Sequence, residues 1–176
     1  MTPGAASGIT PAMTPDMHRL DKICSHPLWQ KYLGEIGRLE ADRIFCRHDV
    51  QHFLDVARIA YIENLEQKAG IPKELIYAAA LLHDIGRHLQ YTEGVSHEEA
   101  SAQLAETILT DCGFTGTETE EILQAIRLHR NSGTAEKNDL AGLLYRADKK
   151  SRACGFCEAR GQRNWPEEKK NMKLTI

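Results

Sequence analysis

The sequence predicts an all-α fold, and three observations support this expectation. Ala and Leu supply most of the apolar residues, while aromatic residues make up only 6% of the chain, a balance that favours helices over strands. Apolar residues recur at helical spacing in several long segments. No stretch alternates between apolar and polar residues for the length of a strand. The expected architecture is therefore a bundle of about six to seven helices.

Proline and glycine mark several of the expected helix ends. Pro27 and Pro72 suit first helical positions, where the missing N–H costs nothing. Gly70 and Gly113 suit C-caps, because glycine tolerates the left-handed conformation found there. These signals divide the chain into short helices connected by turns.

Two capping boxes mark the starts of later helices. Ser96 is followed by Glu99, and Thr117 by Glu120, the spacing that lets each side chain satisfy the other residue's backbone N–H. The segment 86–95 is expected to be a loop. The expected helices cover residues 16–24, 27–38, 42–69, 72–84, 96–112, 117–129 and 138–154.

The 176 residues suggest one compact domain with a core of its own, expected at 16–154. Residues 1–15 lack both a basic start and an apolar stretch, so they resemble neither a signal peptide nor a presequence and are expected to be disordered. Residues 155–176 form a basic tail that packs on the domain or extends from it. Between 149 and 176 there are eight Lys or Arg residues and three acids.

Composition excludes several classes of protein. The net charge of −3 gives no reason to expect a nucleic-acid polymer as partner, and no apolar run reaches the ~20 residues that would span a membrane. Five cysteines, an odd number, indicate reduced thiols and a cytoplasmic protein. Cys154 and Cys157 have the spacing of half a zinc site, but no second pair follows, unless Cys24 or Cys46 completes it in space.

The adjacent pair His83-Asp84 is the most informative feature of the sequence. It ends an apolar helical run that begins at Tyr77, and Gly86 follows it. Neighbouring residues on a helix point about 100° apart, so they rarely serve one site. A metal ion can use both side chains, because it takes ligands from several directions at once.

Further candidate ligands lie on or beside other expected helices, and a helical bundle can bring such groups to one inner surface. His48 and His52 are four residues apart, so they are expected on one face of the 42–69 helix. A nitrogen and carboxylate ligand mix suits Fe, Mn, Zn or Ni, with Mg possible. These ions activate water and polarise phosphoryl oxygens, which is the chemistry of hydrolysis. The other candidates are His97, His129 and Asp148.

Three segments in order resemble the HD-domain superfamily of metal-dependent phosphohydrolases. They are His52-Phe-Leu-Asp-Val-Ala-Arg-Ile-Ala60, Ala80-Leu-Leu-His-Asp-Ile-Gly86 and Ala147-Asp148. The resemblance spans about residues 42–153 and implies an all-α core. It also implies that His52, His83, Asp84 and Asp148 hold one divalent ion.

Two more segments resemble the members of that superfamily that hold two metals. These are His97-Glu-Glu-Ala-Ser-Ala102 and Ala125-Ile-Arg-Leu-His129. The subset includes the HD-type diadenosine tetraphosphate hydrolases, which are closest in layout, and the cyclic-dinucleotide phosphodiesterases. The resemblance implies that His97 and His129 bind a second metal or contact phosphate. The chain lacks the Gly-Tyr-Pro signature of the phosphodiesterases.

Plainer interpretations stay open for the individual histidines. His97 also fits a histidine at a helix start that bonds to a loop. His129 also fits a helix C-terminus, where the dipole favours a cation. His48 also fits an exposed turn of the long helix. Arg47, Arg87, Arg127 and Lys149 lie beside ligands in the sequence and are candidate phosphate clamps, although a solvated side chain is the ordinary state of each.

The leading hypothesis is a metal-dependent phosphohydrolase that cleaves an ester or anhydride of a small phosphorylated molecule, a nucleotide or dinucleotide. One or two ions activate the attacking water, Asp84 belongs to the catalytic centre, Arg87 or Lys149 stabilises phosphoryl charge, and His48 protonates the leaving oxygen. One alternative is a non-catalytic nucleotide-binding or regulatory module on the same core. Another is a di-iron oxygenase on that scaffold.

Overall fold

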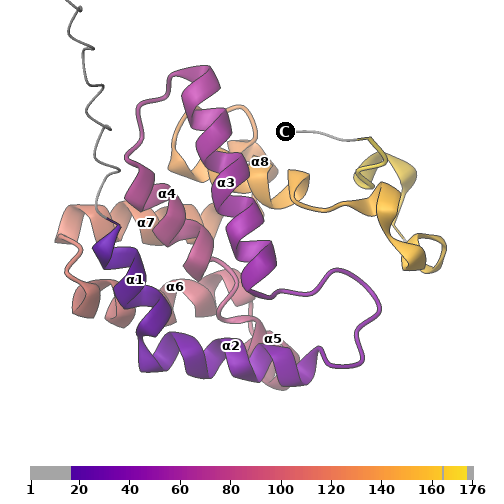
Figure 1. Ribbon diagram of the computed structural model, residues 1–176, viewed down its shortest axis with the longest axis horizontal. Helices are drawn as coiled ribbons and strands as arrows, with labels where there is room; N and C mark the ends of the chain where they lie inside the picture. The colour runs from indigo at the N-terminus through magenta and orange to yellow at the C-terminus, as the bar shows by residue number, and fades with distance from the viewer. Residues whose placement is uncertain (1–16, 164, 174–176) are drawn as a thin grey trace, which may run out of the picture.

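The computed structural model describes residues 17–163 and 165–173, so the disorder expected for residues 1–15 lies outside the described residues. The described residues form helices and short 3-10 turns without a strand, which confirms the all-α prediction (Figure 1). The α-helices are α1 (His18–Ser25), α2 (Pro27–Leu39), α3 (Val50–Gln67), α4 (Lys73–Leu82), α5 (Arg87–Glu93), α6 (His97–Cys112), α7 (Gly116–Leu128) and α8 (Leu140–Lys150).

Helix α4 is the central element of the bundle. Its residues from Leu75 to Leu82 are almost all buried, and a helix that is apolar on every side belongs in the interior. It packs against α3, α7, α8, α1 and α6. The C-terminal end of α4, where His83 and Asp84 lie, is therefore inside the protein, and both residues are 0% exposed.

Helix α3 begins at Val50, eight residues later than the predicted start at Asp42. Asp49 is its N-cap, and the Asp49 carboxylate accepts a hydrogen bond of 3.0 Å from the backbone N–H of His52. The segment before it is the long loop that joins α2 to α3 in Figure 1. His48 lies in this loop, so the expectation that His48 and His52 share one helix face is wrong.

Two other local predictions are corrected. The expected loop 86–95 contains α5, which ends at Glu93 and has Gly94, at φ +72°, as its C-cap. The capping box of α7 uses Thr115 and Glu118, two residues before the predicted pair. Both pairs have the same residue types and spacing, so the sequence pattern alone did not distinguish them. Ser96 is the N-cap of α6 as expected, but its side chain makes no capping hydrogen bond.

The turn after His83 and Asp84 packs directly on α6. The backbone N–H of Gly86 donates to Ser101 Oγ at 2.9 Å. A Cβ atom at Gly86 would lie 2.4 Å from the backbone nitrogen of Ser101, closer than two such atoms can approach. The missing side chain at Gly86 therefore allows α6, which begins at His97, to lie against the end of α4.

The basic tail folds back on the end of α8. The Asn171 side-chain amide donates to the carbonyls of Lys149 at 2.5 Å and Arg152 at 3.0 Å, and the Gly155 N–H donates to the Asn171 carbonyl at 3.0 Å. Helix α8 ends at Lys150, earlier than the predicted residue 154. All five cysteines are free thiols. Among the helices of the described ranges, none is long and apolar enough to cross a membrane.

Candidate metal centre

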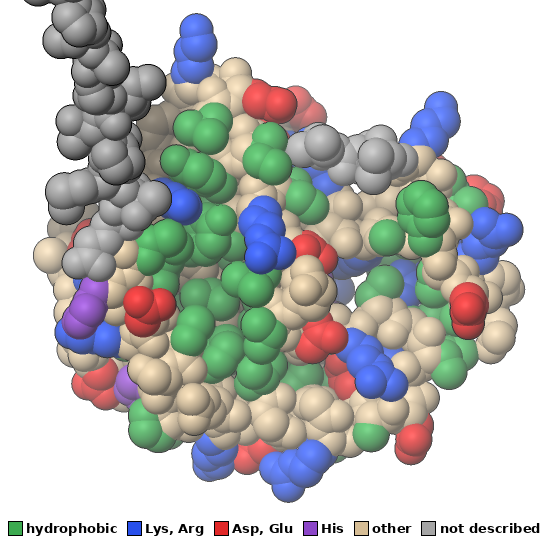
Figure 2. All heavy atoms as spheres, in the orientation of Figure 1, with side chains coloured by type: hydrophobic (Ala, Val, Ile, Leu, Met, Phe, Trp, Pro, Cys, Tyr) green, Lys and Arg blue, Asp and Glu red, His purple; other side chains and the backbone are tan. Residues whose placement is uncertain are grey.

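Two sets of metal-ligating side chains meet in the interior, and Asp84 belongs to both. Histidine is scarce on the face of the molecule shown in Figure 2, because most of the histidines that the structure describes are buried. Within each set, one donor atom from every residue lies within 4.8 Å of the others. The first set is His52, His83, Asp84 and Asp148, and the second is Asp84, His97 and His129.

The first set gathers around one carboxylate oxygen of Asp84. Asp84 Oδ2 lies 3.3 Å from His83 Nε2 and 3.7 Å from His52 Nε2. Asp148 Oδ1 lies 3.7 Å from His52 Nε2. Two imidazole nitrogens and two carboxylate oxygens therefore face a common point, which is a ligand set suited to a divalent ion.

The second set gathers around the other oxygen of the same carboxylate. Asp84 Oδ1 lies 3.1 Å from His97 Nε2 and 3.6 Å from His129 Nε2. The two histidine nitrogens are 3.2 Å apart. Asp84 therefore presents one oxygen to each set.

Helix ends orient two of the ligating rings. His83 is the C-cap of α4 and His129 is the C-cap of α7. His83 Nδ1 lies 2.7 Å from the Ala80 carbonyl, and His129 Nδ1 lies 2.6 Å from the Ile126 carbonyl. A carbonyl only accepts hydrogen bonds, so both rings carry their proton on Nδ1. The lone pair of each Nε2 is left for the shared centre.

The remaining ligands are placed by helix starts and by the packing of α3 on α8. His52 lies in the first turn of α3, and Asp148 lies in the last turn of α8. Ser151 Oγ is 3.4 Å from His52 Nδ1, the nitrogen that faces away from the set. His97 is the first residue of α6. The two sets thus draw on α3, α6 and α8 and on the ends of α4 and α7.

Two buried ring nitrogens without hydrogen-bond partners among the described residues indicate that the first set fits a cation. His52 Nε2 and His83 Nε2 are buried and have no hydrogen-bond partner within the described part of the chain. Buried polar atoms are nearly always paired, so such an orphaned atom requires an explanation. Both nitrogens belong to the first set and face Asp84 Oδ2, and a divalent ion there would satisfy both.

Asp84 is the negative charge at the middle of the centre. Burial alone would raise the pKa of Asp84, but the electrostatic influence of the neighbouring His83 imidazole and Arg87 guanidinium holds that pKa well below its usual value. Arg87 contributes directly, since its Nε lies 3.1 Å from Asp84 Oδ1. Burial lowers the pKa of His97, which favours the neutral imidazole that a metal requires.

Asp148 is flanked by two cations of its own. Burial would raise its pKa, but Arg152 and Lys149 lower it below the ordinary value. Lys149 Nζ lies 2.5 Å and an Arg152 guanidinium nitrogen lies 3.1 Å from Asp148 Oδ2. Burial lowers the pKa of Lys149 as well. Arg152 was not among the predicted site residues, although its position four residues after Asp148 in the helix predicted over 138–154 could have indicated it.

His48 lies at the edge of the centre, with its Nε2 3.7 Å from Asp84 Oδ2. Its Nδ1 is 2.5 Å from Glu40 Oε1, and Glu40 also accepts a hydrogen bond from the Tyr91 hydroxyl. Burial lowers the pKa of His48. Sequence reasoning missed Glu40 and Tyr91, since neither belongs to a motif and their meeting depends on how α2 and α5 pack.

Other candidates lie away from the ligand sets. Arg127 pairs with Glu99 at 3.7 Å and Glu120 at 3.9 Å. Arg47 is exposed and donates to the carbonyl of Ala41 at 2.9 Å. Neither ligand set contains a cysteine, so among the residues that the structure describes neither Cys24 nor Cys46 completes a metal site with Cys154 and Cys157, which are free thiols.

The chain matches the HD domain family over residues 49–153, which include every residue of both ligand sets. This match covers more than half of the chain. The protein therefore belongs to the HD domain family, and the resemblance seen in the sequence is confirmed.

The proteins similar to the chain include two relatives and one solved structure. A Clostridium beijerinckii protein described as uncharacterized is 43% identical over 158 residues, which cover 90% of this chain and 99% of the relative. "Putative phosphohydrolase YueE" of Bacillus subtilis is 33% identical over 140 residues, 72% of each chain. The crystal structure of a "predicted HD superfamily hydrolase" from an uncultured Thermotogales bacterium has a TM-score of 0.56 and 24% identity over 87% of each chain, and shows the same fold.

Proposed function

We propose that the protein is a metal-dependent phosphohydrolase acting on a small phosphorylated molecule, with a nucleotide or dinucleotide as the substrate class. The observation that carries the proposal is the position of Asp84, whose two oxygens face two separate sets of histidines. Membership of the HD domain family and the similarity to a protein named as a phosphohydrolase support it.

A divalent cation bound by such ligands lowers the pKa of a coordinated water toward 7 and polarises a phosphoryl oxygen. His52, His83, Asp84 and Asp148 would hold one ion, and His97 and His129 would hold a second together with Asp84. The metal is of the Fe, Mn, Zn or Ni class, because imidazole and carboxylate groups make up the set.

The nearby cations suit a substrate with phosphoryl charge. Arg87 lies beside Asp84, and Lys149 and Arg152 lie beside Asp148. These groups sit at the edge of a buried centre, where charge interactions are stronger than in water. Arg87 and Lys149 therefore orient the phosphoryl group and stabilise the negative charge that develops on its oxygens.

The reaction forms one bond to phosphorus and breaks another. The oxygen of water bonds to phosphorus and gives up one proton, the bond from phosphorus to the leaving oxygen breaks, and the leaving oxygen takes up one proton. His48 is placed to pass this proton from the water to the leaving oxygen, since its Nε2 faces the centre while Glu40 accepts from the other ring nitrogen. The products are inorganic phosphate, or a phosphomonoester, and the free leaving group.

The test begins with protein purified without a chelator and analysed for its metals. Release of phosphate or nucleoside is then measured from a panel of nucleotides and dinucleotides with added Mn²⁺ or Fe²⁺. Replacing Asp148 by Ala is expected to lower turnover by about a hundredfold or more while helix content is retained. Asp111→Ala, at an exposed carboxylate of α6, is the matched control and should keep full turnover.

Three results would contradict the proposal. Asp148→Ala that keeps most of the turnover would show that the first ligand set is not used. Nucleotide binding without turnover in every metal would identify a non-catalytic binding module. Consumption of dioxygen by the iron-loaded protein, without phosphate release, would identify an oxygenase.

A further inference from the structure

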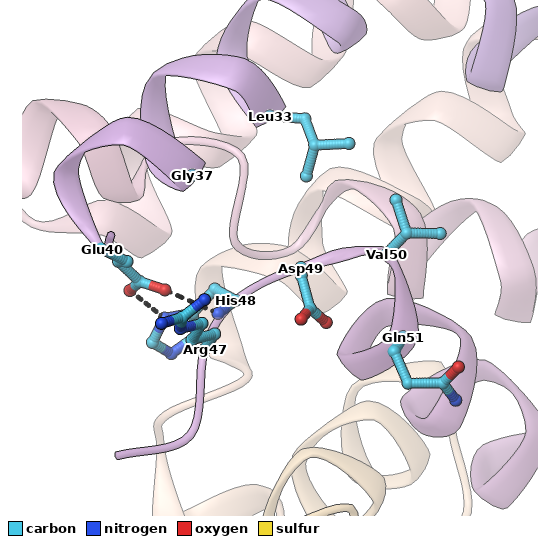
Figure 3. Close-up of a pocket in the computed structure, with 8 residues that line it drawn as sticks. All are labelled: Leu33, Gly37, Glu40, Arg47, His48, Asp49, Val50 and Gln51. Carbon is cyan, nitrogen blue, oxygen red and sulfur yellow. Dashed lines mark hydrogen bonds and ion pairs between the residues drawn. The ribbon is translucent and has the colours of Figure 1, made fainter. Parts of the chain in front are cut away.

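A cavity of about 440 Å³ lies beside the metal centre, between the C-terminal half of α2 and the start of α3 (Figure 3). Its size is within the usual range of small-molecule sites, roughly 300–1,000 Å³. None of the metal ligands lines it. The lining residues are Leu33, Gly37, Glu40, Arg47, His48, Asp49, Val50 and Gln51.

One imidazole ring connects this cavity to the metal centre. His48 lines the cavity, and its Nε2 lies 3.7 Å from the metal-facing oxygen Asp84 Oδ2. Figure 3 shows the Glu40 carboxylate directed at His48, and both the ring nitrogen and the backbone N–H of His48 bond to it. A molecule with its phosphate at the centre would therefore have its next group beside His48, at the cavity.

The cavity wall combines apolar and polar groups. Leu33 and Val50 supply aliphatic surface, and Val50 is 39% exposed. Arg47 donates one of its five N–H groups to the Ala41 carbonyl, which holds the guanidinium at the rim. Asp49 also lies in the wall, where its carboxylate accepts from the backbone of His52. An organic group with an apolar ring and hydrogen-bonding edges fits this wall better than a second phosphate.

A glycine keeps part of the cavity open. Gly37 lies in the last turns of α2, and a Cβ atom built there would meet nothing within 4 Å. Glycine inside a helix costs roughly 0.5–1 kcal/mol relative to alanine. A side chain at this position would extend into the space that the cavity occupies. Gly34, one turn earlier on the same helix, is equally open but does not line the cavity.

We propose that this cavity is the subsite for the organic leaving group of the substrate, a group of nucleoside size and chemistry. The proposal rests on the proposed function, because it places the phosphate of the same substrate at the metal centre. It assigns substrate selectivity to α2 and to the 47–51 segment, which contribute no metal ligand.

The test compares Gly37→Leu with Gly34→Leu. Both variants add the same side chain to the same helix and improve its helix propensity, and circular dichroism and melting curves confirm that both fold. Calorimetric titration of the metal-loaded proteins with 5′-AMP, 5′-GMP, 5′-CMP and 5′-UMP measures subsite binding. Titration with inorganic phosphate measures binding at the metal centre alone.

Gly37→Leu is expected to weaken binding of the preferred nucleoside monophosphate by about tenfold or more, a loss of about 1.4 kcal/mol, with phosphate binding unchanged. Gly34→Leu should match the unmodified protein with every ligand. The subsite proposal is contradicted if both leucine variants bind nucleotides equally well. It is also contradicted if no nucleotide binds more tightly than phosphate. Because the readout is binding, it stands apart from turnover, so a protein that binds but does not hydrolyse contradicts only the proposed function.

Discussion

The carboxylate of Glu40 accepts two hydrogen bonds from His48, one from the backbone N–H at 2.8 Å and one from ring Nδ1 at 2.5 Å. A third comes from the Tyr91 hydroxyl at 2.5 Å. Burial would raise the pKa of Glu40, but the bonds from His48 and Tyr91 lower it to about 2, so the group is ionised at neutral pH. This pairing fixes the His48 ring so that Nε2 faces Asp84.

Glu40→Gln should lower kcat by about tenfold, because the amide can no longer accept from both N–H groups of His48 and the ring loses its fixed orientation. The metal content is expected to change little, since Glu40 belongs to neither ligand set. Tyr91→Phe, which leaves both bonds to His48 in place, should have a smaller effect. Equal losses in the two variants would assign the effect to general loosening of the 40–48 segment.

His97→Ala should remove one metal equivalent and leave the other, because His97 belongs only to the second set. Asp84→Asn should lower the metal occupancy of both sites, since Asp84 faces both sets. Elemental analysis of the purified variants gives the stoichiometry. His88→Ala is the control, because His88 is buried but bonds to Ile85 and Glu35 outside the centre. Full metal content in His97→Ala would contradict a second ion site.

Gly86→Ala should destabilise the protein by ~1–3 kcal/mol, because the new Cβ atom would overlap the backbone of Ser101 and Ala100 in α6. Metal affinity should fall as well, since α6 begins at His97. Urea unfolding measures the first effect and metal titration the second. Gly116→Ala, where a Cβ atom has open space, serves as the control. Equal stability of the two variants would mean that α6 moves away without cost.

Glu118→Gln should reveal a pH-dependent contribution to stability. Arg19 donates two hydrogen bonds to the Glu118 carboxylate at 2.8 and 3.0 Å and lowers its pKa from 4.5 to about 2. A carboxyl group whose folded-state pKa is lowered stabilises the protein above its unfolded pKa, and this contribution disappears as the pH falls toward the folded value.

The difference in melting temperature between the unmodified protein and Glu118→Gln should therefore be largest above pH 5 and shrink between about pH 4.5 and 2. Glutamine can still accept from Thr115, so the capping box survives the substitution. Glu120→Gln on the same helix is the control, because Glu120 lies 3.9 Å from its partner Arg127 and is exposed. A difference that stays constant with pH would rule out the ion pair as its source.

The candidate ligands named from the sequence lie close together in the structure, and the positions of several of them follow from local rules. The order of His52, His83-Asp84 and Asp148 resembles the family, and the chain's membership of it explains why these residues meet. The rings of His83 and His129 are oriented by carbonyls three residues earlier, a consequence of standing directly after a helix.

Two kinds of feature could not be predicted from the sequence. One is the choice between alternative helix starts, and the other is contact between residues far apart in the chain. The apolar residues Ile44 and Phe45 suggested that the long helix begins at residue 42, but the Asp49 cap begins it at Val50 and leaves Ile44 57% exposed. The bonds from Glu40 to His48 and Tyr91 join residues 8 and 51 positions away along the chain. No sequence spacing indicates such a meeting, since it arises only when α2 packs on α5.

The candidate ligands are spread along the chain, so binding of a cation would be coupled to folding of the helical bundle. Donors from residue 52 to residue 148 converge on Asp84, so the folded state offers a set that the unfolded chain cannot reproduce. Thermal resistance should then rise with the logarithm of free metal and fall on chelation. If the proposed site holds an ion in the cell, a shortage of that ion would shorten the lifetime of the folded protein.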